Sequence, residues 1–247
     1  MKRLTPAVQR IFASSRVHGL RQSSSLSAEK EQKFMSTPDK EVLVKASVQP
    51  VVLKEFISPA LQEEDKFGLG KLFTVEDMFN ARLHYGHKRL GVCVFDLEIT
   101  KKYLERALNF VAHVAMRGGI ILFVTSNRAT IFDVERAAQE VGQFSHTRKW
   151  LQGTLTNTKQ LIGSSVRLPD TIIFLSTLTS MGASHPAIIE AAKMGIPTVG
   201  VVDTNSDPAY LTYLVPANDD TPESAGFLLR LFKEAILRGQ QARNNSD

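Results

Sequence analysis

The chain has 247 residues, of which 43% are hydrophobic and 22% charged, enough apolar material for one sizeable α/β domain with extensions. Its single cysteine, Cys93, excludes an internal disulfide and offers no zinc framework. The formal net charge of +5 is matched by the first 28 residues, which carry five Lys and Arg and no acid. The isoelectric point of 9.3 is therefore no evidence, by itself, for nucleic-acid binding.

Residues 1–28 combine arginine and serine with scattered apolar residues, a composition typical of a mitochondrial transit peptide. A merely disordered basic tail is the alternative. The apolar stretches are too short for a secretory signal or a membrane span. Residues 29–72 are charged and contain Pro38, Pro50 and Pro59, so we expect an N-terminal extension without a core of its own, ordered by its neighbours.

From residue 73 to 240, apolar runs alternate with amphipathic segments, as in a βαβ protein. Helices are predicted over 75–84, 100–116, 131–141, 186–194 and 223–238, and strands over 91–96, 120–125, 171–176, 198–202 and 213–215. Continuous apolar strands such as 120–124 suit a parallel sheet that is buried on both faces. The expected fold is a three-layer α/β/α sandwich with a mostly parallel sheet, followed by a flexible tail over 241–247.

Residues 148–157 bring together two cations, the only tryptophan, a glycine and several hydroxyl and amide side chains: Arg148, Lys149, Trp150, Gly153, Thr154, Thr156 and Asn157. The cations could neutralise phosphates and the indole could stack on a base. The glycine would let the backbone approach a partner closely, and the polar side chains could bind phosphate or ribose oxygens. The alternative is an anchoring tryptophan beside a helix capped by Thr154 or Thr156.

Charge is unevenly distributed in the rest of the chain. Residues 80–167 hold 13 Lys and Arg against 6 acids, whereas residues 29–79 and 168–247 are both net acidic. The basic middle could form a face for phosphates and leave the flanks for protein neighbours. For any single cation, an ordinary solvated charge is the simpler interpretation.

Loops at the carboxyl ends of parallel strands often bind small ligands, so an enzyme has to be considered. The fourth predicted strand is followed by Asp203, Asn205, Asp207 and Pro208, and a structural turn explains these residues most simply. The chain has no P-loop, GxGxxG turn or GxSxG elbow. His84 and His87 could share a helix face but have no third ligand at matching spacing. We therefore predict no catalytic residue, no metal and no cofactor.

Together with 148–157, the ordered short motifs at 85–87, 96–98, 108–110, 168–170, 195–197, 202–208 and 216–220 resemble those of ribosomal protein two of the small subunit. The resemblance implies a flavodoxin-like strand order and a non-catalytic ribosomal constituent. Its expected partners are small-subunit rRNA and adjacent ribosomal proteins, without a membrane or a small-molecule substrate. With the leader, it implies the mitochondrial branch and the matrix.

The resemblance also implies that Gly86, His87, Lys88 and Arg89 lie beside rRNA, and we expect Arg128 of the basic middle to be a further contact. A helix-terminating Gly86 with His87 facing the helix dipole is the alternative. The loop after Arg89 is shorter than in relatives. The charged helical hairpin typical of bacterial members is missing between residues 165 and 168, which suits the mitochondrial branch. A small-ligand α/β enzyme and a non-ribosomal scaffold of the same family are the competing functions.

Overall fold

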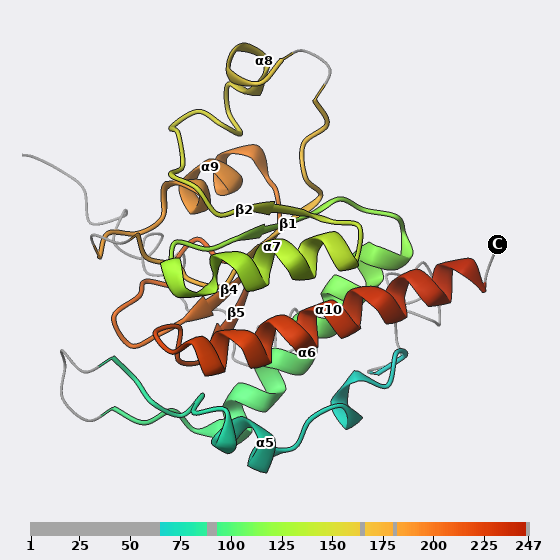
Figure 1. Ribbon diagram of the computed structural model, residues 1–247, viewed down its shortest axis with the longest axis vertical. Helices are drawn as coiled ribbons and strands as arrows, with labels where there is room; N and C mark the ends of the chain where they lie inside the picture. The colour runs from blue at the N-terminus through green and yellow to red at the C-terminus, as the bar shows by residue number, and fades with distance from the viewer. Residues whose placement is uncertain (1–64, 88–92, 164–165, 180–181, 246–247) are drawn as a thin grey trace, which may run out of the picture. The chain divides into compact units, whose positions relative to one another are not determined.

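The computed structural model describes residues 65–87, 93–163, 166–179 and 182–245 (Figure 1). The predicted transit peptide and residues 29–64 of the predicted extension lie outside the described residues, as do Lys88 and Arg89.

Five strands form one sheet in the order β2-β1-β3-β4-β5, and all four pairings are parallel. The strands are β1 (Ile121–Val124), β2 (Phe144–His146), β3 (Thr171–Phe174), β4 (Thr198–Val202) and β5 (Tyr213–Pro216). This is the flavodoxin-like order, whose topological switch point lies between β1 and β3. The predicted parallel sheet is confirmed.

The α-helices are α5 (Val75–Asn80), α6 (Leu97–Met116), α7 (Ile131–Glu140), α8 (Thr158–Leu161), α9 (Pro186–Met194) and α10 (Pro222–Asn244). Short 3-10 helices, η1 (Leu69–Lys71) and η3 (Arg128–Thr130), precede α5 and α7. Between β2 and β3, the described residues contain only the four-residue α8. Among the helices in the described ranges, none is long and apolar enough to cross a membrane.

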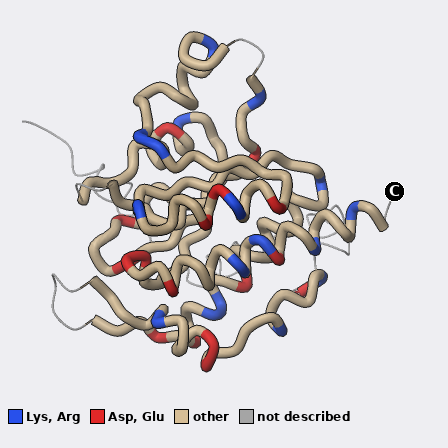
Figure 2. The backbone as a smooth tube through the Cα atoms, in the orientation of Figure 1, with Lys and Arg blue, Asp and Glu red and all other residues tan. Residues whose placement is uncertain are grey.

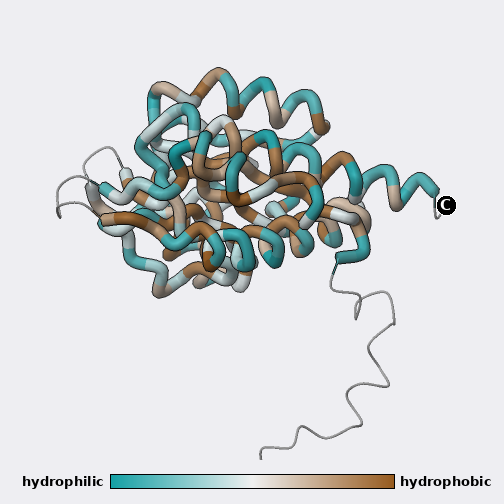
Figure 3. The backbone as a smooth tube through the Cα atoms, turned by 90° about the horizontal axis from the view of Figure 1, so that it is seen from below, coloured by the Kyte–Doolittle hydropathy of each residue, from teal (hydrophilic) through white to brown (hydrophobic). Residues whose placement is uncertain are grey.

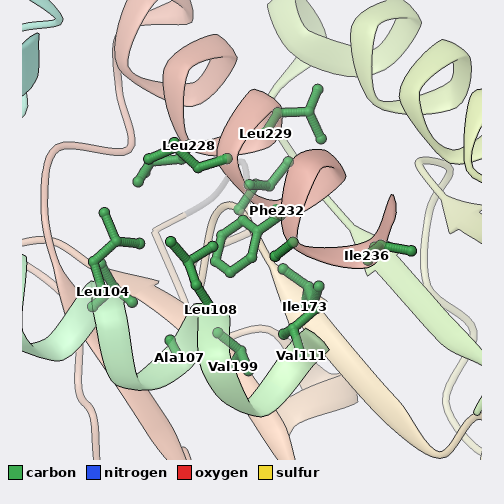
Figure 4. Packing of buried hydrophobic residues seen from close by; sticks show 14 of the residues in the cluster. Leu104, Ala107, Leu108, Val111, Ile173, Val199, Leu228, Leu229, Phe232 and Ile236 are labelled. Carbon is green, nitrogen blue, oxygen red and sulfur yellow. The ribbon is translucent and has the colours of Figure 1, made fainter. Parts of the chain in front are cut away.

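Helices cover both faces of the sheet, which confirms the three-layer arrangement. Side chains from α6, α7 and α10 pack on one face with Phe123 and Ile173, and Figure 4 shows Leu108 and Phe232 in this cluster. On the other face, side chains of α9 and of the segment after β2 pack with Phe174. Each fully buried side chain of this size contributes about 1.5–3 kcal/mol relative to exposure.

Helix α10 runs past both of its predicted limits. It ends at Asn244 rather than at 238, so residues 241–244 of the predicted flexible tail are helical; Figure 3 shows these last turns as mainly hydrophilic. Gly239 is buried and lies close against α6, since a Cβ there would be 2.3 Å from the carbonyl oxygen of Ala112. This glycine serves a close crossing of two helices instead of ending one.

Other differences from prediction lie near the start of the domain. The first helix ends at Asn80 because the backbone turns at Arg82, whose φ is 59°. In the described part of predicted strand 91–96 there is only an isolated antiparallel bridge between Tyr85 and Val94. Packing begins before residue 73, since Phe67 and Leu69 belong to the main core.

Candidate RNA-binding surface

The segment 150–155 is held by one buried carboxylate on α9. Glu190 is 7% exposed and accepts three N–H bonds: Oε1 from Trp150 Nε1 at 3.3 Å and from the Gly153 amide at 2.7 Å, and Oε2 from the Leu155 amide at 3.0 Å. Hydrogen bonds to a charged acceptor are the stronger ones, so this carboxylate fixes the backbone of the segment. Sequence reasoning missed Glu190, because nothing local distinguishes it from a solvated helix residue.

Trp150 is an anchor and not a stacking platform. It is 7% exposed and its ring lies edge-on to His146 and His185, with centroid distances of 4.7 and 5.7 Å. Burial, followed by the charge of His146, lowers the pKa of His185 to about 4. His185 Nδ1 accepts from the amide of Ala187 at the start of α9, as the neutral ring can. Because the indole is buried, the stacking role expected of Trp150 is wrong.

Gly153 has φ 92°, which favours glycine, and its N–H points to Glu190 instead of to a partner. Neither predicted capping threonine caps a helix, because the N-cap position of α8 is Asn157. The hydroxyl of Thr154 instead donates to the carbonyl of Leu151 at 2.6 Å.

The remaining members of the stretch face solvent. Arg148, Lys149, Thr156 and Asn157 are all exposed, and no ion pair involves either cation among the described residues. We call residues 148–157 the anchored loop. It presents two cations without an ion pair, Arg148 and Lys149, followed in sequence by two exposed polar side chains, Thr156 and Asn157. This pattern fits phosphate and ribose contacts better than base stacking.

Three other predicted residues, His87, Arg128 and Asn205, line a cleft of about 660 Å³ at the carboxyl edge of the sheet. It is polar, and its lining includes Ser126, Asn127, Arg128, Ser176, Asn205 and Asp219. Arg128 is exposed there. The cleft adjoins the switch point between β1 and β3, where ligands bind in folds of this kind.

His87 faces acidic residues instead of lying free for RNA. Its Nδ1 is 2.7 Å from Asp220 Oδ2, and its amide donates to Asp203 Oδ1 at 3.1 Å. One ligand atom from each of the three residues lies within 4.8 Å of the others, so they could hold a cation, since imidazole and carboxylate are common metal ligands. The sequence analysis considered His87 together with His84 and did not find this group. His84 stacks on Phe79 instead.

Two carboxyl groups near the cleft have raised pKa values. Burial, followed by the charge of Asp203, raises the pKa of Asp219 to about 6. Burial also raises the pKa of Asp203, whose Oδ2 is enclosed without a hydrogen-bond partner.

The predicted turn after β4 is present. The amide of Ser206 donates to the carbonyl of Asp203 at 3.0 Å, and the amide of Ala209 to Asp207 Oδ1 at 3.0 Å. Asn205 Oδ1 accepts from the hydroxyl of Ser206, and the carbonyl of Pro208 from the amide of Leu211. Asp203 does more than form a turn, because it also fixes His87.

A family model described as Ribosomal protein S2 matches residues 80–172 and 162–239, more than half of the chain. The chain belongs to the ribosomal protein S2 family. Small ribosomal subunit protein uS2m of Bos taurus is 46% identical over 202 residues, which cover 76% of this chain and 69% of that protein. The resemblance stated from the ordered motifs is thereby confirmed.

As a ribosomal protein S2, the chain is a structural protein and not an enzyme. The two matched stretches meet at residues 162–172, where the chain passes from α8 to β3. The anchored loop between β2 and α8 lies inside the matched region.

Proposed function

We propose that this chain is a structural constituent of the mitochondrial small ribosomal subunit, where it binds rRNA and adjacent ribosomal proteins and supports assembly and translation. Its 46% identity to a protein named uS2m carries this proposal. The exposed, unpaired cations of the anchored loop supply the chemistry for RNA, because each phosphate they neutralise releases a counterion.

The proposed mechanism is adhesion to a folded RNA surface. Arg148 and Lys149 neutralise phosphates, while Thr156 and Asn157 bond to ribose or phosphate oxygens. Glu190 keeps the loop ordered before binding, so less conformational entropy is lost when the complex forms. Arg128 contributes from the carboxyl edge, and Lys88 and Arg89 follow His87 directly in sequence.

Delivery to the mitochondrial matrix belongs to the same proposal and rests on the acid-free, serine-rich leader of residues 1–28. Fusing residues 1–28 to a fluorescent protein tests this part. We expect import into mitochondria, whereas a uniformly distributed fusion protein would contradict the proposed transit role.

Gradient sedimentation of mitochondrial lysate, with and without magnesium chelation, tests the ribosomal role. We expect the wild-type chain to co-migrate with the small subunit, and the double variant Arg148→Glu with Lys149→Glu to remain in light fractions. The matched control reverses the charges of Lys71 and Arg117, which are also exposed and lie outside the loop. The control should sediment as the wild type does.

If the double variant Arg148→Glu with Lys149→Glu enters the small subunit as the wild type does, the proposed RNA-binding role of the loop is contradicted. A wild-type chain that stays in the light fractions under both conditions would instead favour the non-ribosomal scaffold.

A further inference from the structure

A second aromatic side chain, on α7, has the exposure that Trp150 lacks. Phe132 lies in the first turn of α7 and is 77% exposed, the highest value among the large hydrophobic side chains in the described parts of the chain. A single exposed apolar residue is common on protein surfaces, so its neighbours decide what it can do.

Cations lie on both sides of this residue along the chain. Arg136 follows Phe132 by four residues in α7, so the two are neighbours on one helix face, and Arg128 lies in η3, directly before α7. Both arginines are exposed, and neither is in an ion pair with any described residue. The exposed ring thus lies between two exposed arginines in the sequence.

Of the three acids on α7, one is engaged by a cation of another helix. Glu140 pairs with Lys233 of α10, whose hydrogen bond and charge lower the pKa of that carboxyl, with a smaller effect of Arg136. Asp133 lines the groove between α7 and α10, where Lys233 and Arg136 also lie. The surface around Phe132 therefore carries mixed charge, with Arg128 and Arg136 beside Asp133 and Glu135, and none of these four residues is in an ion pair with a described residue.

This surface adjoins the anchored loop. The hydroxyl of Thr147 donates to Glu135 of α7, which is three residues from Phe132 on the helix. Thr147 immediately precedes Arg148 and Lys149. Figure 2 shows Lys and Arg on the segment after β2, and both basic and acidic residues on α7.

We propose that Phe132 is an RNA-stacking residue, whose ring holds an unpaired base of the small-subunit rRNA while Arg128 and Arg136 neutralise the adjacent phosphates. Unstacked bases of rRNA loops pack on aromatic rings, and arginine supplies both charge and a planar group. Because α7 is joined through Glu135 to Thr147, next to Arg148 and Lys149 of the loop, a partner with phosphates that binds the loop can also reach Phe132. This inference rests on the proposed rRNA-binding function and extends its site from the loop to α7.

Titration of the full chain with transcribed small-subunit rRNA tests the inference, with Phe132 replaced by Ala, Leu or Tyr. We expect Phe132→Ala and Phe132→Leu to weaken binding by about 5- to 100-fold, the range for losing one stacked base, and Phe132→Tyr to stay within about threefold of wild type. We expect Arg136→Gln to lower the slope of log affinity against log salt by about one. Because Phe132 is exposed, circular dichroism and the thermal midpoint should not change.

Two outcomes overturn the inference alone. Phe132→Ala could bind as wild type does while Arg148→Gln with Lys149→Gln weakens binding, which would restrict the RNA site to the loop. Phe132→Leu could bind as well as Phe132→Tyr, which would assign the ring to an apolar contact, such as one with a protein. If wild type binds this rRNA no better than unrelated RNA and no variant has an effect, the proposed function fails as well.

Discussion

Replacing Glu190 should loosen the anchored loop without removing any surface charge. In Glu190→Gln, the amide oxygen can still accept from Trp150 Nε1 and the Gly153 amide, which already share Oε1 in the wild type. The amide nitrogen replaces Oε2, so it would face the Leu155 amide as donor to donor and leave a buried N–H without a partner. One buried N–H without a partner lowers the free energy of unfolding by about 1–3 kcal/mol. Glu190→Ala orphans all three donors and should cost about 3–5 kcal/mol.

Urea unfolding followed by circular dichroism measures this loss, and tryptophan fluorescence reports the loop alone because Trp150 is the only tryptophan. We expect Trp150 emission to shift to longer wavelength in both variants, and rRNA affinity to fall although Arg148 and Lys149 are intact. Glu76→Gln, an exposed acid on α5, is the matched control and should leave both signals unchanged. Wild-type stability in Glu190→Gln would refute the argument that this carboxylate holds the loop.

Three further changes follow from buried groups. Because the pKa of Asp219 is raised to about 6, its contribution to stability is complete below its unfolded value and is lost as pH rises through 6. At pH 7.5 in the presence of a chelator, the free energy of unfolding of Asp219→Asn should therefore exceed that of the wild type by up to about 3 kcal/mol. A difference of the same size at pH 4 would contradict this origin. The contribution of His185 to stability has the opposite pH dependence. Because its pKa is lowered to about 4, this contribution is present above pH 6.5 and is lost as the pH falls through 4. Trp150 fluorescence should show this loss as an acid transition, and the transition should be smaller in His185→Asn. An acid transition that is unchanged in His185→Asn would exclude His185 as the cause of the transition. Gly239→Ala should cost about 1–3 kcal/mol in urea because its Cβ meets the Ala112 carbonyl, whereas Gly226→Ala in the same helix, with open space around it, should gain about 0.5–1 kcal/mol.

Much of the fold is readable from local pattern. The helix at Pro186–Met194 was predicted at its observed limits, and β1, β3, β4 and β5 fall within or close to their predicted ranges. These elements are marked by continuous apolar runs or by Pro and Gly at their ends, and such signals lie within a few residues of each other. The edge strand β2 was not predicted, since three half-exposed residues carry no periodicity.

The candidate site divides in the same way. By itself, the sequence determined the α/β class, the family motifs, the basic middle of the chain and the loop that carries Arg148 and Lys149. Only the tertiary structure decided that Trp150 is buried and that Glu190 holds its loop from 35 to 40 residues away. It also decided that His87 meets Asp220, 133 residues along the chain. The physical reason is that residue type and spacing set local conformation, whereas the burial of a side chain and the partner of a polar atom depend on which distant segments pack against it.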